Sequence, residues 1–189
     1  MAVIAASKSN LDLKKIFSVI PRLSPVEGRF EKVGKIKNKS LVFLDYAHTP
    51  DALQTCILNI REQFSDKHIS VLFGCGGDRD KGKRSKMGKI ADKYADKIYL
   101  TDDNPRHERP KKIRDEIKRG IKKRQIIEIS NRKEAIAKAI NNLNTGDILI
   151  VAGKGHEKIQ QIGNRKVFLS DRQIILNSIK KRILTYLKI

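Results

Sequence analysis

The sequence predicts an α/β fold built on a mainly parallel sheet of about six strands, with helices on both faces. Short apolar runs alternate along the chain with longer amphipathic stretches of helical periodicity. One of these runs, residues 41–44, is apolar at every position, as expected for a strand buried on both faces. Strands that alternate with helices pair in parallel through right-handed crossovers. Together these observations predict a Rossmann-like arrangement.

The individual elements follow from strand runs and helix caps. Strands are expected at residues 29–37, 41–44, 69–73, 97–101, 125–129 and 147–152, with a short edge strand at 166–169. Helix starts with capping residues are expected at Thr49 before Pro50, at Asn131 three residues before Glu134, and at Ser170 three residues before Gln173. A further helix is expected near residues 85–96, after a glycine-rich loop, and another from Pro110.

The first 28 residues differ from the rest. Apolar residues at mixed helical spacing predict a helix within residues 1–20, which Pro21 ends. A short helix cannot bury its apolar face alone, so this face either packs on the main domain or belongs against a partner that this chain lacks. Residues 21–28 contain two prolines and a glycine, which is typical of a hinge. Residues 29–189 then form the main domain.

Length, charge and composition limit the classes of function that this chain can have. The 189 residues suffice for one cored domain with an appendage, and no apolar run reaches the ~18 residues of a membrane span. A net charge of +20 suggests nucleic-acid binding, but aromatic residues make up 5% and Trp is absent, so base-stacking platforms are scarce. We favour a lysine-rich surface, with neither nucleic acid nor membrane as a partner. Two isolated cysteines and the lack of a signal-peptide pattern predict a cytoplasmic protein.

The stretch 99–106 (YLTDDNPR) carries the strongest candidate for binding. An apolar strand passes there into a polar loop, and ligands bind at the carboxyl ends of strands in open α/β sheets. Pro105 fixes its own φ and pushes Asn104 into an extended conformation, so Arg106 stands on a stiff loop. An Arg held in this way suits bidentate recognition of a carboxylate or phosphate. The alternative is an ordinary turn with a solvated Arg.

The loop after the 41–44 strand (DYAHTP) offers contacts for a nucleotide. Asp45 could accept hydrogen bonds from ribose hydroxyls, as carboxylates do in dinucleotide folds, and His48 could touch a base or phosphate. The alternative is that both residues only tie down a turn.

The glycine-rich loop 74–84 (GCGGDRDKGKR) favours an anion. Its glycines permit close backbone approach, and its cations are Arg79, Lys81, Lys83 and Arg84. The spacing fits neither the dinucleotide fingerprint nor a P-loop, so a flexible basic loop is an equal alternative. Cys75 within it is expected to be small and buried rather than nucleophilic.

The loop 152–157 (AGKGHE) follows the last buried strand. It resembles part of a phosphate loop, but no Ser or Thr follows to bind Mg²⁺. Glu157 could instead accept from a substrate ammonium. The histidines lack metal-ligand spacing, so we expect no metal site.

Taken in order, the motifs DYAHTPDAL, FGCGGDRDKGKR, TDDNPR, AGKGHE and SDR resemble the C-terminal domain of the Mur ligase family, in particular the branch that adds meso-diaminopimelate. The resemblance runs from about residue 25 to the end, and departs from the family where Ser85 and Lys86 stand for a common Pro-Leu. It implies an ATP-dependent ligase of peptidoglycan synthesis. Such a ligase joins UDP-MurNAc-L-Ala-D-Glu to diaminopimelate through an acyl phosphate.

The resemblance also implies roles for single residues. Those expected to bind diaminopimelate are Arg79, Asp103, Asn104, Pro105, Arg106, Gly153 and Glu157. Those expected to bind ATP are Arg29, Asp45 and His48. The two arginines 79 and 106 would hold the distal carboxylate, and Glu157 the amino end. No residue of this chain is given a catalytic or metal-ligating role.

The same resemblance implies that parts of the ligase lie outside this chain. The family's P-loop, its Mg²⁺ ligands and its UDP-sugar site belong to other domains, and no such motifs occur here. Residues 1–20 are then expected to be the last helix of the central ATPase domain, and the chain alone is expected to be inactive. The alternatives are a standalone nucleotide- or amino-acid-binding module without turnover, and a basic nucleic-acid-binding protein.

Overall fold

The computed structural model describes residues 6–9, 11–22, 26–36 and 38–186. Its main sheet has the strand order β1-β2-β6-β3-β4-β5. These strands are β1 (Glu31–Lys35), β2 (Leu41–Asp45), β3 (Ile69–Phe73), β4 (Lys97–Leu100), β5 (Ile126–Glu128) and β6 (Ile148–Ala152). Only β1 runs antiparallel to its neighbour, and β2, β6, β3, β4 and β5 pair in parallel. The predicted mainly parallel sheet is confirmed.

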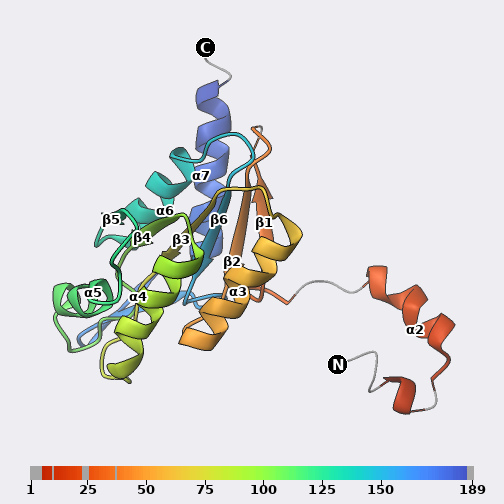
Figure 1. The fold of residues 1–189 in the computed structure, drawn as a ribbon, viewed down its shortest axis with the longest axis horizontal. Coiled ribbons are helices and arrows are strands. Elements are labelled where there is room, and N and C mark those ends of the chain that lie inside the picture. The colour runs from red at the N-terminus through yellow and green to blue at the C-terminus, as the bar shows by residue number, and fades with distance from the viewer. Residues whose placement is uncertain (1–5, 10, 23–25, 37, 187–189) are drawn as a thin grey trace.

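Helices cover both faces of this sheet (Figure 1). They are α3 (Pro50–Gln63), α4 (Gly82–Tyr94), α5 (Pro110–Lys118), α6 (Arg132–Asn141) and α7 (Asp171–Tyr186). The predicted caps hold them: the Thr49 hydroxyl accepts from the Ala52 amide at 3.3 Å, and the Asn131 side chain accepts from the Glu134 amide at 3.2 Å. Each bond satisfies a backbone donor that a helix start leaves open.

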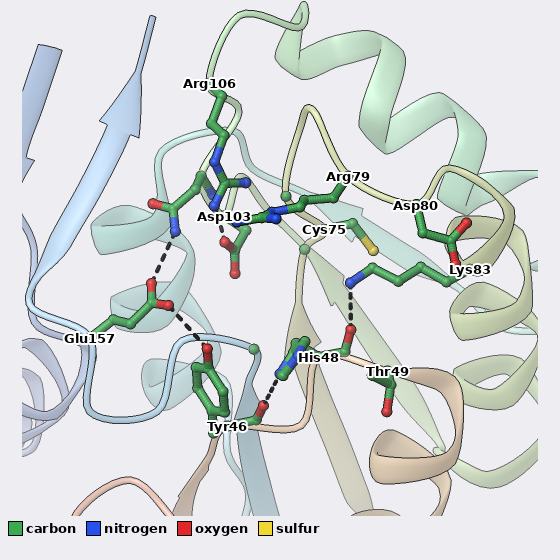
Figure 2. A pocket seen from close by; sticks show the side chains of 14 residues that line it. Tyr46, His48, Thr49, Cys75, Arg79, Asp80, Lys83, Asp103, Arg106 and Glu157 are labelled. Atoms are coloured by element: carbon green, nitrogen blue, oxygen red, sulfur yellow. Dashed lines mark hydrogen bonds between the residues drawn. The ribbon is translucent and has the colours of Figure 1, made fainter. Parts of the chain in front are cut away.

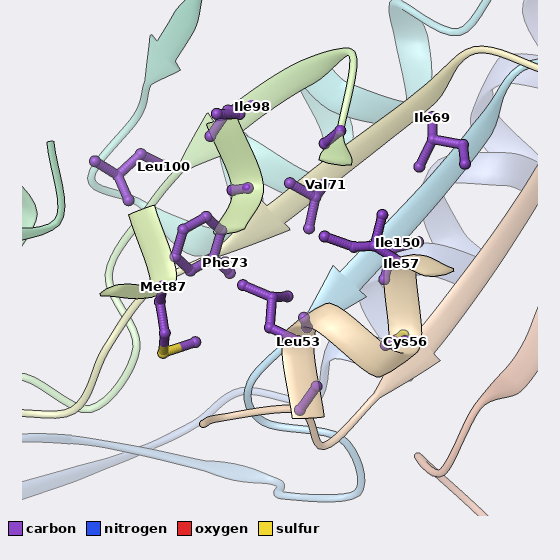
Figure 3. Packing of buried hydrophobic residues seen from close by; sticks show 14 of the residues in the cluster. Leu53, Cys56, Ile57, Ile69, Val71, Phe73, Met87, Ile98, Leu100 and Ile150 are labelled. Atoms are coloured by element: carbon purple, nitrogen blue, oxygen red, sulfur yellow. The ribbon is translucent and has the colours of Figure 1, made fainter. Parts of the chain in front are cut away.

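The period of two within each strand divides the core into two layers. On β2, Phe43 packs under α3, whereas Val42 and Leu44 face α6 and α7. The layer beneath α3, α4 and α5 is drawn in Figure 3, with Val71, Phe73 and Ile150 of the sheet meeting Met87 of α4 and residues of α3. Because both faces of each central strand are buried, their runs are continuously apolar.

Two predictions differ from the structure. The expected edge strand at 166–169 is β8 (Arg165–Phe168), but it pairs with β7 (Ile159–Ile162) in a separate antiparallel hairpin rather than with the main sheet. The hairpin turns at Gly163, whose φ of 56° favours glycine. Helix α4 begins at Gly82 rather than near residue 85, because the Asp80 carboxylate accepts from the Gly82 amide at 2.7 Å and starts the first turn early.

The N-terminal segment forms helix α2 (Leu13–Val19) and the 3-10 turn η1 (Ile20–Arg22). Figure 1 shows α2 standing apart from the α/β body, and none of its residues is buried. Leu13, Phe17 and Val19 are exposed. Part of the predicted hinge, residues 23–25, lies outside the described residues. Across the described parts of the chain, no helix is both long and apolar enough to cross a membrane.

Candidate functional site

The carboxyl ends of β2, β3, β4 and β6 bring the four predicted loops together around one pocket of about 440 Å³ (Figure 2). The sequence-predicted residues that line it are His48, Arg79, Asp103, Asn104, Arg106, Gly153 and Glu157. Lys83, predicted as a cation of the glycine-rich loop, and Thr49, predicted as a helix cap, also line it, whereas Tyr46 lines it but was not assigned a role from the sequence. Arg29, Asp45 and Pro105 lie outside the lining.

One side of the pocket is cationic. In Figure 2, Arg79 and Arg106 extend from different loops toward the same part of the pocket. The Arg106 guanidinium donates to the Gly77 carbonyl at 2.8 Å, and the residue holds a φ of 49°. A residue other than glycine rarely adopts a positive φ unless its surroundings hold it there. Backbone strain of this kind concentrates at functional positions. Within the described parts of the chain, neither arginine forms an ion pair, so both charges remain open to an anion.

Close backbone approach sets the position of these arginines. The Gly77 amide donates to the Asn104 carbonyl at 2.9 Å, and a Cβ at Gly77 would lie 2.0 Å from the Pro105 carbonyl oxygen. Only glycine fits there, which explains one glycine of the glycine-rich loop. Pro105 is buried and shapes the backbone rather than lining the pocket. Its part in binding stays a prediction.

The opposite side of the pocket is acidic. Glu157 accepts from the Asn104 amide nitrogen at 3.0 Å and lies 3.4 Å from the Tyr46 hydroxyl, which donates to it (Figure 2). Asp103 is drawn between Glu157 and the two arginines in Figure 2; it is buried, and one of its oxygens accepts from the Asn104 backbone amide at 2.6 Å. Gly153 has a φ of 111°, and a Cβ there would lie 3.0 Å from the Asp103 carboxylate. Glycine at this position thus keeps the acidic side open.

The hairpin β7–β8 holds the loop 103–106 in place. The Gln160 side chain donates to the Asp103 carbonyl at 2.6 Å, and the Gln161 amide donates to the Asn104 side-chain oxygen at 2.9 Å. The Arg106 amide donates to the Gln161 carbonyl at 3.0 Å. Sequence analysis missed these glutamines, because a side chain that supports a loop leaves no motif of its own.

Arg84 does not serve as an anion-binding cation of the glycine-rich loop. Its side chain is fully buried and donates to Glu108 at 2.8 and 2.9 Å and to Glu116 at 2.6 Å. It also donates to the Gly76 carbonyl at 3.1 Å. The bonds to Arg84 hold the pKa of the Glu108 carboxyl at about 2, well below its ordinary value. Arg84 therefore ties the glycine-rich loop to the loop that carries Arg106.

The predicted nucleotide contacts cluster around Tyr46. The Arg29 guanidinium lies over the Tyr46 ring, 4.5 Å from the ring centre. The His48 ring packs against the same Tyr46 ring in an edge-to-face arrangement, with 4.5 Å between the two ring centres. His48 Nδ1 lies 2.8 Å from the Tyr46 carbonyl oxygen, which can only accept, so this nitrogen carries the proton. Asp45 accepts from the backbone amides of Phe30 at 2.6 Å and Ala47 at 2.7 Å. Its contact with a ribose stays a prediction.

Cys75 is the thiol of the pocket. Burial raises its pKa to about 12, and its sulfur lies 3.6 Å from that of Met87. A thiol that stays protonated is a poor nucleophile, in agreement with the sequence-based expectation. Among the residues that the structure describes, no group of three or more acidic, His or Cys side chains could hold a metal ion.

The loops of this pocket are those whose motifs resemble Mur ligases, and residues 28–155 match the family described as "Mur ligase, glutamate ligase domain". The chain belongs to the Mur ligase family. A UDP-N-acetylmuramoyl-L-alanyl-D-glutamate–2,6-diaminopimelate ligase of Rickettsia felis is 46% identical over 176 residues. That match takes in 93% of this chain but 32% of the relative, so the chain spans about a third of its length.

Solved structures agree with this membership of the Mur ligase family. A structure of a UDP-N-acetylmuramoyl-L-alanyl-D-glutamate–2,6-diaminopimelate ligase superposes with a TM-score of 0.77 at 36% identity, covering 96% of this chain and 37% of that one. E. coli FolC in complex with ADP superposes with a TM-score of 0.55 at 16% identity, covering 83% of this chain and 32% of that one. At that identity the second likeness shows the fold alone.

Proposed function

We propose that this chain is the amino-acid- and nucleotide-binding part of an ATP-dependent ligase that joins meso-diaminopimelate to UDP-MurNAc-L-Ala-D-Glu. Membership of the Mur ligase family and the names of its relatives support the reaction class. The pocket at the carboxyl ends of the strands supports the substrate. Residues 1–20, with α2, are proposed as the last helix of a preceding ATPase domain and 21–28 as the hinge.

One observation carries the proposal: two arginines, which have no ion-pair partner among the described residues, and Glu157 line the same pocket. Diaminopimelate has an amino acid group at each end, and it differs from lysine by a second carboxylate. Arg79 and Arg106 suit that carboxylate, because a guanidinium can hold both oxygens through parallel bonds. Glu157, across the pocket, suits an ammonium. Lysine lacks this second carboxylate and would leave both guanidiniums without a partner.

In this reaction the chain supplies position and charge. ATP converts the dipeptide carboxylate to an acyl phosphate and leaves as ADP, and the diaminopimelate amine then displaces phosphate to form the amide. The residues described above hold the amine-bearing substrate at a fixed place, which lowers the entropic cost of the second step. No described residue is assigned to proton transfer.

ATP fits the side of the pocket around Tyr46. Arg29 is exposed and held over the Tyr46 ring, which leaves its charge available to phosphates, while His48 presents a ring edge beside it. We propose these residues, with Asp45, for nucleotide contact. Mg²⁺ accompanies ATP in such ligases, and its ligands are proposed to lie in the other domains. Both the nucleotide and the UDP-linked substrate place the reaction in the cytoplasm.

A chimera tests the proposal. We expect the 189-residue chain alone to release no phosphate from ATP in the presence of Mg²⁺, UDP-dipeptide and diaminopimelate. The same chain, grafted onto the rest of the Rickettsia felis relative in place of its matching third, should form the tripeptide product. A graft carrying Arg106→Ala is the matched control. A folded chimera without turnover, or turnover by the chain alone, would contradict the proposal.

A further inference from the structure

Lys154 is a buried cation next to the acidic side of the pocket. Its side chain is fully buried, and among the described residues it is the only lysine classed as buried. It follows Gly153 in the turn after β6, two residues beyond the strand. A buried ammonium is costly unless acceptors surround it, so its position calls for an explanation.

Three acceptors saturate the Lys154 ammonium. It donates to the Glu157 carboxylate at 2.9 Å, to the Ile159 carbonyl at 2.7 Å and to the Asn104 side-chain oxygen at 3.2 Å. A lysine ammonium has three donors, and each is used. The side chain is not part of the pocket lining, so it acts on a ligand only through its partners.

We propose that Lys154 is a positioning residue that presents Glu157 and Asn104 to the ammonium of the amino-acid substrate; this inference rests on the proposed function. The Asn104 oxygen accepts from Lys154 and from the Gln161 amide, which fixes the orientation of the side-chain amide. Its nitrogen must then point to Glu157, as observed at 3.0 Å.

The arrangement leaves one carboxylate oxygen for the ligand. Glu157 Oε2 accepts from both Lys154 and Asn104. Within the described residues, Glu157 Oε1 has only the long contact with the Tyr46 hydroxyl at 3.4 Å, and Glu157 lines the pocket. An incoming ammonium therefore meets an oxygen with unused acceptor capacity on a carboxylate whose orientation is already fixed.

Lys154 also keeps this carboxylate charged. Burial raises the pKa of the Glu157 carboxyl, but the hydrogen bonds and charge around it, those of Lys154 first, together outweigh burial, and the pKa lies below its ordinary value. Tyr46 and Asn104 add smaller effects in the same direction. Arg132, which is buried and paired with Asp171, also interacts electrostatically with Glu157 and Asp103. Without Lys154, burial would favour the neutral acid, which binds an ammonium poorly.

The first test needs no substrate. Carboxyl carbon chemical shifts of Glu157 are followed by NMR against pH in the 189-residue chain, in Lys154→Met, and in Lys158→Met as a control. Lys158 is exposed and its side chain has no hydrogen bond or ion pair among the described residues. We expect the Glu157 pKa to rise by about 1 to 3 pH units in Lys154→Met alone. An unchanged value would overturn the proposal. If Lys154→Met does not fold, Lys154→Gln gives the same comparison.

The second test measures meso-diaminopimelate binding by calorimetry. We expect Lys154→Met to weaken binding about tenfold or more, and Glu157→Gln to weaken it as well. The double variant should bind no worse than Glu157→Gln, because residues that act as a unit are not additive. Fully additive losses, or full binding by Lys154→Met, would refute a positioning role. Absence of binding by the parent chain would instead contradict the proposed function, while the titration still decides the role of Lys154.

Discussion

The positively charged residues behind the pocket lining, here called its back, are paired with carboxylates, whereas two arginines in the lining, here called its mouth, have no such pairing within the described part of the chain. At the back, Arg84 pairs with Glu108 and Glu116, and Lys154 with Glu157; both cations are fully buried. At the mouth, Arg79 and Arg106 have no carboxylate partner among the described residues. Arg79 lies in the glycine-rich loop, and Arg84 lies in the first turn of α4 that follows it. The difference teaches that pairing, rather than residue type, separates cations that build the site from those that bind.

The largest effect is expected at the back of the pocket. Arg84→Met should lower the free energy of unfolding by about 3–5 kcal/mol, because it removes the fully buried cation that two half-buried carboxylates share. Urea unfolding followed by circular dichroism measures it. Lys86→Met, on the exposed side of α4, is the control and should stay within about 0.5 kcal/mol. A parent-like stability of Arg84→Met would mean that the buried pair does not hold the loops.

At the mouth, Arg106→Ala should change binding rather than stability. We expect a loss of about 2–5 kcal/mol in meso-diaminopimelate binding, or roughly thirtyfold and more, since a desolvated carboxylate loses its partner. Arg106→Lys should restore little of it, because a point charge cannot replace two parallel bonds. Calorimetry and urea unfolding on the same samples separate the two quantities. A destabilised Arg106→Ala with intact binding would reverse the distinction between back and mouth.

The pH dependence of stability sharpens the same comparison. The pKa of the Glu108 carboxyl is lowered from its ordinary 4.5 to about 2 in the folded chain, chiefly by its bond to Arg84. A lowered folded-state pKa stabilises above the unfolded value, and this contribution is lost as pH falls toward the folded value. The stability gap between the parent and Glu108→Gln should therefore shrink between about pH 5 and pH 2. Unfolding curves at several pH values measure it, and a constant gap would contradict this pairing.

The smallest effect is expected for Arg79→Ala. Arg79 is exposed, and no described residue fixes its guanidinium by a hydrogen bond, so ordering it on a ligand costs side-chain entropy. We expect diaminopimelate binding to weaken about tenfold, near the lower end for a hydrogen bond to a charged group. Calorimetry on Arg79→Ala and Arg106→Ala under the same conditions shows which variant loses more affinity for diaminopimelate. A larger loss for Arg79→Ala would make it the principal carboxylate ligand.

Much of this fold could be predicted because local signals agreed with the tertiary structure. Strand β3 was predicted at its observed bounds, and Thr49 and Asn131 were predicted as the caps that they are. The hairpin β7–β8 was harder, since its strands have four residues each and the sequences IQQI and RKVF lack a clear apolar alternation. The Gly163-Asn164 pair between them was the available sign of a turn.

The candidate site could be predicted at the level of loops but less well at the level of single side chains. Strand ends placed the four loops on one edge of the sheet, and the family resemblance supplied residue roles. Neither the strand ends nor the resemblance showed that Arg84 turns inward. The sequence of a basic loop is the same whether its cations are solvated or paired with a glutamate 24 residues away. Lys154 was hidden for a similar reason: the sequence did not show that its ammonium turns inward to Asn104 of a distant loop and to Glu157 and Ile159 just after it.

The central claim is that this pocket distinguishes an amino acid by its second carboxylate. Calorimetric titration of the parent chain with meso-diaminopimelate and with L-lysine tests it most directly. We expect diaminopimelate to bind at least about thirtyfold more tightly, since an unpaired, desolvated guanidinium costs about 2–5 kcal/mol. Arg106→Ala should remove most of this difference. Equal affinity for the two amino acids in the parent chain would contradict the claim.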